Sequence, residues 1–264
     1  MTLLDNIEYI IVDLDGVVWR GRDIIEDNVS SLARLLDLGF KLRFITNNST
    51  KSRADYIVKL RSLGLKVNPE DVTTSGRAAS LWLKRVQGES RVYVIGEEGL
   101  VEELRVEGHI VTESSLEASS LVVGLDRRVC YNKLSEAVRA LARGILFIAT
   151  NLDPNLPQED TIIPGAGAII AFLEVASGRK PDFIAGKPNP WILEVALGEA
   201  IDYSRVLVIG DRIDTDIVLA EKVGAKPVLV LTGAHRTLDE NIRKQLEHRG
   251  VIVLNNLKEL INKT

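Results

Sequence analysis

Short, continuous apolar runs recur along the whole length of this 264-residue chain, and they limit its fold more than any other feature. Each run is followed directly by Gly, Asp, Asn or Thr. Continuous rather than alternating apolar residues are typical of strands buried on both faces of a sheet. The runs are residues 9–12, 42–45, 92–95, 121–123, 145–149, 183–185, 206–209, 228–231 and 251–254.

Helical patterns lie between these runs. Asn28 is suited to cap a segment whose leucines share one face before Gly39, and a second such segment ends at Gly64. Strands that alternate with helices predict βαβ units, hence an α/β fold with a mostly parallel sheet between helix layers. Residues 79–182 carry strand and helix patterns of their own and, at roughly 100 residues, are long enough for a domain. We therefore expect them to be inserted into a core of residues 1–78 and 183–264.

Composition excludes several classes of partner. The net charge is −4 and the sequence pI about 5.6, which argues against the cationic face that a nucleic-acid backbone requires. No apolar run approaches the roughly 20 residues of a membrane-spanning helix. The single cysteine, Cys130, forms no internal disulfide, and this fits a reducing compartment. We expect a cytoplasmic protein that binds neither nucleic acid nor membrane, with a homodimer left open.

Polar residues at the ends of the predicted strands mark the candidate site, because ligands of such sheets bind beyond the carboxyl ends of the strands. Asp13 and Asp15 follow the first run and point the same way. Two carboxylates 4 Å apart repel by about 4 kcal/mol at an effective dielectric constant near 20, unless a cation lies between them. Mg²⁺ takes such oxygen ligands, and an aspartate can also attack phosphorus. The alternative is an acidic strand-to-turn exit.

Asp211 directly follows another strand run and is placed to complete a metal site with Asp13 and Asp15. Asp216, five residues on, is suited to orient the metal ligands. The alternative for this segment is an acidic first helical turn that stabilises the helix dipole.

Two further strand ends carry groups suited to a phosphoryl group. Thr46 and Asn47 supply a hydroxyl, an amide and backbone N–H donors near a helix start. Lys187 follows Gly186 and supplies a cation that would neutralise charge on a transferring phosphoryl group. The alternatives are a plain helix cap and an exposed loop lysine.

Four segments together resemble the haloacid dehalogenase (HAD) superfamily of phosphohydrolases: Asp13–Trp19, Thr46–Ser49, Gly186–Pro188 and Gly210–Asp216. Within it, the chain looks most like the NagD-like, p-nitrophenyl phosphatase group with a type IIA cap. The resemblance covers nearly the whole chain. Its supporting segments are residues 74–76, 94–99, 122–126, 149–151, 164–167 and 231–233.

The resemblance implies a Rossmann-like, three-layer α/β/α core with an inserted α/β cap of the C2 type. It implies that Asp13 is the nucleophile and Asp15 the acid/base. Mg²⁺ would be bound by Asp13, by the backbone carbonyl of Asp15 and by Asp211, with Asp216 supporting the metal site. Thr46 and Asn47 would bind the phosphoryl group, and Lys187 would steady it.

The function implied is a Mg²⁺-dependent phosphatase of small phosphorylated metabolites, such as a sugar phosphate or phosphoglycolate, acting through an aspartyl-phosphate. A phosphotransferase or mutase of the same superfamily and a non-catalytic phosphometabolite-binding protein are the alternatives. In the cap, Asn151 and Asp153 are candidates for contacting the leaving group, although a simple turn explains them equally well. Trp19 either shapes the pocket or packs as an aromatic side chain.

Overall fold

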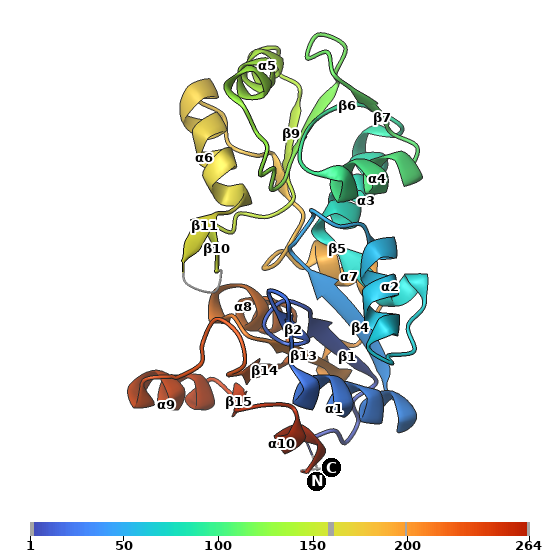
Figure 1. Ribbon diagram of the computed structural model, residues 1–264, viewed down its shortest axis with the longest axis vertical. Coiled ribbons are helices and arrows are strands. Elements are labelled where there is room, and N and C mark those ends of the chain that lie inside the picture. Colours follow the sequence, from blue (N-terminus) through green and yellow to red (C-terminus); the bar gives the residue numbers. More distant parts are fainter. Residues whose placement is uncertain (1–2, 158–160, 199, 263–264) are drawn as a thin grey trace. The chain divides into compact units, whose positions relative to one another are not determined.

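The computed structural model describes residues 3–157, 161–198 and 200–262, which form two compact units (Figure 1). The first unit consists of residues 1–46, 57–72 and 196–264, and the second of residues 47–56 and 73–195. The α/β fold with a mostly parallel sheet, predicted from the alternation of strand and helix patterns, is confirmed, and each unit has such a sheet. No helix of the described ranges is long and apolar enough to cross a membrane.

The main sheet has six strands in the order β15-β14-β13-β1-β4-β5, and the pairings from β15 to β4 are parallel. Residues Ile10 to Val12 of β1 are fully buried, as expected of a strand covered on both faces. The strands are β1 (Tyr9–Asp13), β4 (Lys41–Thr46), β5 (Val72–Thr74), β13 (Val206–Gly210), β14 (Lys226–Val230) and β15 (Ile252–Leu254); a short hairpin is formed by β2 (Trp19–Arg20) and β3 (Asp23–Ile24).

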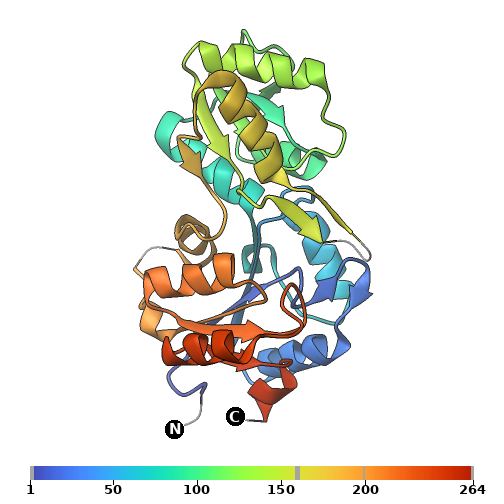
Figure 2. The same ribbon diagram turned by 90° about the vertical axis from the view of Figure 1, so that its left-hand side faces the viewer.

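The connections of this sheet run in two opposite directions. From β1 the chain passes through α1 to β4, whereas from β13 it passes through α8 to β14 and through α9 to β15. Right-handed crossovers therefore put α1 on one face and α8 and α9 on the other, which gives three layers (Figures 1 and 2). The helices are α1 (Glu26–Asp37), α2 (Arg53–Ser62), α8 (Val218–Val223), α9 (Glu240–His248) and α10 (Lys258–Ile261), with helical turns η1 (Pro69–Asp71), η2 (Tyr203–Arg205) and η3 (Ile213–Ile217).

The second unit contains a five-stranded parallel sheet in the order β12-β9-β8-β6-β7. Helices α3 and α4 pack together, and so do α5 and α6; the two pairs cover opposite faces (Figure 1). The elements are α3 (Ser75–Gln87), β6 (Arg91–Ile95), α4 (Glu98–Val106), β7 (Ile110–Thr112), β8 (Ser120–Val123), α5 (Tyr131–Ala142), β9 (Leu146–Ala149), β10 (Asn155–Pro157), β11 (Ile162–Pro164), α6 (Ala166–Ser177), β12 (Phe183–Ile184) and α7 (Trp191–Leu197).

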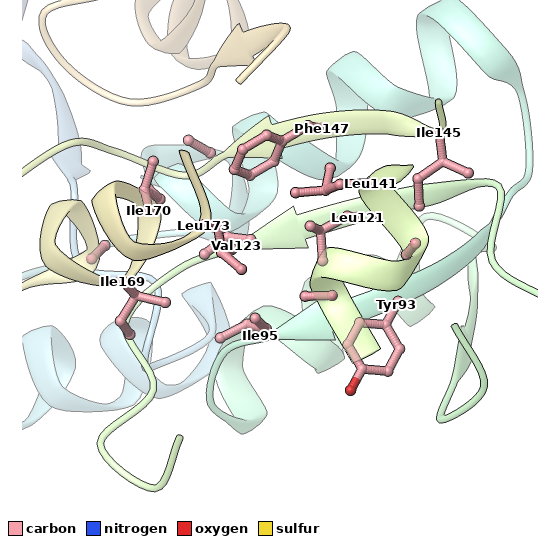
Figure 3. Close-up of a cluster of buried hydrophobic side chains, with 14 of the residues drawn as sticks. Tyr93, Ile95, Leu121, Val123, Leu141, Ile145, Phe147, Ile169, Ile170 and Leu173 are labelled. Carbon is pink, nitrogen blue, oxygen red and sulfur yellow. The ribbon is translucent and has the colours of Figure 1, made fainter. Parts of the chain in front are cut away.

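One hydrophobic cluster holds α5 and α6 against this sheet. Leu121 and Phe147 from the strands meet Leu141 of α5 and Leu173 of α6, and all four are at most 1% exposed (Figure 3). Each such side chain contributes about 1.5–3 kcal/mol through burial. The second unit thus has a core of its own.

The predicted insertion, residues 79–182, lies inside the second unit, which extends further on both sides and also takes in residues 47–56. At one end, α3 already begins at Ser75, where Thr74 accepts the Arg77 N–H as N-cap. At the other end, β12 pairs with β9, so Phe183 and Ile184 belong to this second sheet.

Candidate active site

The candidate site of the first unit lies where the connections of its sheet diverge. Asp13 is the last residue of β1, and Asp211 follows directly after the neighbouring strand β13. Asp216 lies in the π-helical turn η3 that comes next. Oxygens of these three buried carboxylates lie within 4.8 Å of one another. The sequence prediction that the ends of these two strands bring acidic groups together therefore matches the geometry.

Glycines allow the backbone to approach these carboxylates closely. Gly16 has a φ of +86°, which favours glycine, and a Cβ there would collide with the Asp211 carboxylate. A Cβ at Gly233 would do the same, and one at Gly210 would collide with Asp216. This close packing restricts the positions that the Asp211 and Asp216 carboxylates can adopt.

Backbone donors fix the same carboxylates. The Ala234 N–H donates to Asp211 Oδ2 at 2.6 Å, and the Arg212 N–H donates to Asp216 Oδ2 at 3.1 Å. Asp214 lies outside the cluster, exposed and paired with Arg212 at 2.6 Å. The acidic segment therefore divides into two buried groups at the site and one on the surface.

A buried amide supports the loop after β1. The Asn28 Nδ2 donates to Val17 O at 2.8 Å and to Thr232 Oγ1 at 3.2 Å, while Asn28 Oδ1 accepts the Leu257 N–H at 2.8 Å. Thr232 in turn donates to Gly16 O at 2.6 Å. The prediction that Asn28 caps a helix is wrong, because α1 begins two residues earlier and Asn28 lies inside it, fully buried.

The acidic cluster fits a divalent cation. Three buried carboxylates at this separation repel one another unless a cation is bound, and hard oxygen ligands are those that Mg²⁺ prefers. The side chain of Asp15 is exposed and lies outside the cluster. A part for Asp15 in metal binding therefore rests on its backbone carbonyl, as the family resemblance implies.

Two side chains donate to Asp15. Trp19 Nε1 donates to Asp15 Oδ1 at 3.0 Å, and Thr46 Oγ1, at the end of β4, lies 3.4 Å from Asp15 Oδ2. Sequence reasoning did not find the contact with Trp19. The only signal for it was the spacing of four residues within one loop.

The remaining predicted residues meet within the second unit. Asn47 accepts the Lys187 N–H at 2.8 Å through Oδ1, and its Nδ2 donates to Lys187 O and to Asp153 Oδ2, both at 3.2 Å. Asn151 Nδ2 donates to Asn47 O at 2.7 Å, and Asn151 Oδ1 accepts the Asp153 N–H at 3.0 Å. The structure thus brings Asn47, Lys187, Asn151 and Asp153 together through the carboxamide and carbonyl of Asn47.

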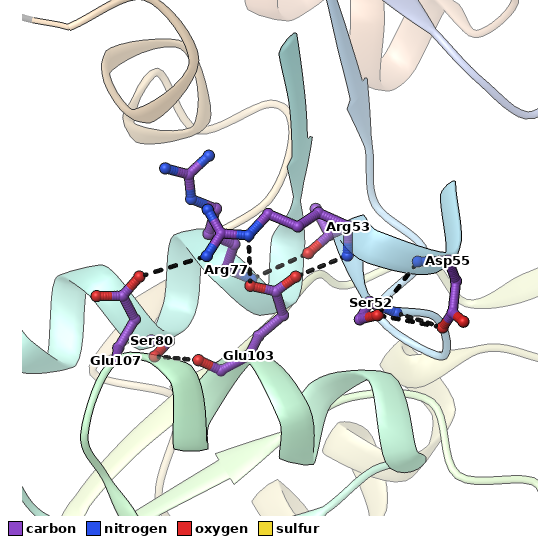
Figure 4. Close-up of polar contacts among 8 residues, drawn as sticks. Ser52, Arg53, Asp55, Arg77, Ser80, Glu103 and Glu107 are labelled. Atoms are coloured by element: carbon purple, nitrogen blue, oxygen red, sulfur yellow. Dashed lines mark hydrogen bonds and ion pairs between the residues drawn. The ribbon is translucent and has the colours of Figure 1, made fainter. Parts of the chain in front are cut away.

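Residues 47–56 are anchored to the second unit by ionic contacts (Figure 4). Glu103 of α4, which is 1% exposed, accepts the Arg53 N–H at 2.7 Å and lies 3.4 Å from Arg53 Nε. Glu107 lies 3.8 Å from Arg53 Nη2. Burial raises the pKa of Glu103, and the backbone and charge of Arg53 act against this rise. The segment that follows Thr46 is therefore held against α4 by hydrogen bonds and ion pairs.

Comparison with known proteins agrees with this geometry. Residues 10–109 match the family model of haloacid dehalogenase-like hydrolases, and residues 184–260 match a HAD-hydrolase-like model. The structure superposes on a p-nitrophenyl phosphatase from Archaeoglobus fulgidus with a TM-score of 0.89 at 38% identity, covering 97% of this chain and 99% of that one. The chain belongs to the haloacid dehalogenase-like hydrolase family.

Other members of this HAD family are also similar. Phosphoglycolate phosphatase 1A of Arabidopsis thaliana is 34% identical over 88% of this chain and 70% of its own length. The sugar-phosphatase AraL of Bacillus subtilis is 34% identical over 88% of this chain and 86% of its own. A glycerol phosphate phosphatase from Mycobacterium tuberculosis, solved in complex with magnesium, has a TM-score of 0.85 at 31% identity and covers 98% of this chain and 78% of that one. The predicted family, its NagD-like group and the class of phosphoric monoester hydrolase are confirmed.

Proposed function

We propose that this HAD-family chain hydrolyses small phosphomonoesters with Mg²⁺, through an aspartyl-phosphate. The buried cluster of Asp13, Asp211 and Asp216 carries the proposal, because Asp13, the proposed nucleophile, lies among carboxylates that repel one another unless a cation is bound. Asp15 supports it, since an exposed carboxyl beside that cluster is accessible to a leaving group.

The proposed reaction has two steps. In the first, an Asp13 carboxylate oxygen attacks phosphorus, the bond to the leaving oxygen breaks, and Asp15 gives that oxygen its proton. In the second, Asp15 takes a proton from water as the water oxygen attacks phosphorus, which releases phosphate and restores Asp13. The first step leaves Asp15 deprotonated, as the second requires, and the second step restores its proton.

Other residues would bind the phosphoryl group and the metal. Asp13, Asp211 and the backbone carbonyl of Asp15 would hold Mg²⁺, with Asp216 supporting them; the bound ion would neutralise phosphate charge. Thr46 and Asn47 would donate to phosphoryl oxygens. The carboxamide of Asn47 already contacts Lys187 and Asp153, so its backbone N–H is the suited donor. The Lys187 ammonium would add positive charge.

The proposed substrates are small phosphomonoesters such as phosphoglycolate or a sugar phosphate, which the names of several relatives include. Asp153, which is partly exposed, would contact the leaving group. Asn151 would orient Asp153, because Asn151 Oδ1 accepts the Asp153 N–H at 3.0 Å. A cytoplasmic location and a homodimer stay predictions.

The test is hydrolysis of p-nitrophenyl phosphate with Mg²⁺, in EDTA, and by Asp13→Asn. We expect the variant to lose at least about 10³-fold in kcat, because an amide is a poor nucleophile. EDTA should abolish turnover reversibly. Full activity of the variant or in EDTA would disprove the mechanism, and transfer to an added alcohol in preference to water would favour the phosphotransferase alternative.

A further inference from the structure

Trp19 closes the loop that carries Asp15. The Gly16 N–H donates to Trp19 O at 2.7 Å, and residues 15 and 19 form an isolated bridge. The Trp19 side chain is 2% exposed, so packing fixes the direction of its indole N–H. That N–H ends on Asp15 Oδ1 at 3.0 Å. A rigid donor therefore holds one oxygen of a carboxyl that is itself exposed.

The orientation of this carboxyl matters for proton transfer. A general acid must come within roughly 2.6–3.2 Å of the oxygen that it protonates, and an exposed aspartate otherwise samples several rotamers. With Oδ1 on the indole, Oδ2 lies on the side of Thr46 Oγ1, at 3.4 Å. The two hydrogen bonds thus give each oxygen of the Asp15 carboxyl a different partner.

Lys59 of α2 adds to this arrangement. Its Nζ lies 3.5 Å from the centre of the Trp19 ring, in cation–π contact. Burial lowers the pKa of Lys59, and the charge of Asp15 acts in the opposite direction. A cation on the ring face draws electron density from the indole, which makes its N–H a stronger donor. Lys59, Trp19 and Asp15 all belong to the first unit.

We propose that Trp19 is a positioning residue for proton transfer: its indole N–H holds Asp15 in the orientation from which the carboxyl protonates the leaving oxygen, and Lys59 strengthens that hydrogen bond. The proposal rests on the proposed function, in which Asp15 is the acid/base. The indole keeps its own proton throughout, and the transferred proton passes from Asp15 to the leaving oxygen.

The consequence depends on the leaving group. An alkoxide, as released from glycerol 1-phosphate, is strongly basic and requires a proton as the bond to phosphorus breaks. 4-Nitrophenolate is weakly basic and departs without one. Misplacing Asp15 should therefore slow formation of the aspartyl-phosphate selectively for alkyl phosphates, whereas loss of the nucleophile or of the metal site slows this step for both substrates.

The experiment compares Trp19→Phe with the wild type on glycerol 1-phosphate and p-nitrophenyl phosphate. We expect kcat/KM for glycerol 1-phosphate to fall about 10- to 100-fold, the loss that one hydrogen bond to a charged group produces. The kcat/KM for p-nitrophenyl phosphate should stay within about three-fold, because its leaving group departs without the proton of Asp15. This constant excludes the later step, common to both substrates, in which Asp15 activates water. Thermal unfolding monitors folding.

Trp191→Phe is the matched control. It removes an indole N–H that donates to Ala78 O at 2.7 Å in the second unit, so the chemical change is the same but Asp15 is untouched. The ratio of kcat/KM for the two substrates should stay at the wild-type value. A selective loss in this control would overturn the proposal.

Lys59→Met supplies an independent variant that keeps Trp19 and most of the lysine stem. It should lower kcat/KM for glycerol 1-phosphate about two- to five-fold, and it should have no further effect when combined with Trp19→Phe. If Trp19→Phe does not fold, this variant alone decides. Equal losses on both substrates, or none, would overturn the proposal; inactivity of the wild type on both would instead overturn the proposed function.

Discussion

The two units contain the same kind of sheet but use it differently. Both sheets are parallel, and both have a point where the connections diverge, between β1 and β13 in the first unit and between β6 and β8 in the second. In the first unit, three buried carboxylates occupy this point. In the second unit, the protein's own residues 47–52 do: the Gly99 N–H donates to Thr50 O at 3.3 Å, and Ser49 Oγ lies 3.3 Å from Thr150 Oγ1.

The difference comes from the residues that follow the strands. Aspartates lie at the end of β1 and after β13, whereas glycines, Gly96 and Gly124, follow β6 and β8. A Cβ at Gly124 would lie 2.5 Å from Ser49 Oγ, so the glycine makes room for the chain. The fold supplies a crevice at such a point, and the neighbouring side chains decide whether it holds a charged site or a segment of the protein.

The largest effect is expected from replacing one carboxylate of the acidic cluster in the first unit. Asp211→Asn should lower kcat/KM at least about 10³-fold, because a proposed metal ligand is lost. In EDTA its Tm should rise by about 2–4 °C, since one of three mutually repelling charges is gone. Steady-state kinetics and calorimetry measure the two effects.

Asp126→Asn is the counterpart in the second unit. Asp126 is 4% exposed and pairs with Lys133 Nζ at 2.5 Å, so this variant should lose about 1–2 kcal/mol of stability and keep its activity within about three-fold. The comparison would break if Asp126→Asn abolished activity as Asp211→Asn does.

A substitution that adds a side-chain atom tests how tightly residues 47–56 fill the place in the second unit where the connections of the sheet diverge. A Cβ at Gly99 would collide with the backbone of Lys51, so Gly99→Ala should lower the free energy of unfolding by about 3 kcal/mol. Gly144→Ala is the control, because Gly144 has a φ of +80° and open space around it, and only about 1 kcal/mol of backbone strain is expected. Denaturant unfolding measures both; equal losses would show that the crevice is not closely filled.

The smallest effect concerns the pH dependence of stability that arises from Glu103 of α4, which contacts Arg53. Burial raises the pKa of Glu103 above its ordinary 4.5, so the folded protein loses stability as pH rises through the raised pKa. Glu103→Gln removes this loss, and the Tm of the variant minus that of the wild type should therefore increase from acid to neutral pH, by about 1–2 °C. Exposed Glu98 on the same helix supplies the matched control variant, Glu98→Gln, and the same pH trend in both variants would contradict the prediction.

The sequence predicted the parts of the fold that depend on local pattern. The run at residues 206–209 became β13, and its neighbour in the sheet is β1, so Asp13 and Asp211 met as expected. Three features depend on contacts that no periodicity encodes. They are the assignment of residues 47–56 to the second unit, the burial of Asn28 inside α1 and the bond from Trp19 to Asp15.

The division of the chain has a consequence for protein engineering. The second unit is made of two separate pieces of sequence, and a Cβ at Gly99 of the longer piece would collide with Lys51 of the shorter one. A chimera that exchanges only residues 73–195 for those of a relative would leave the new sheet facing a segment shaped for the old one. Exchanging residues 47–56 as well keeps both halves of that fit from a single parent. The transferable module is therefore discontinuous, and its shorter piece begins at the residue after Thr46.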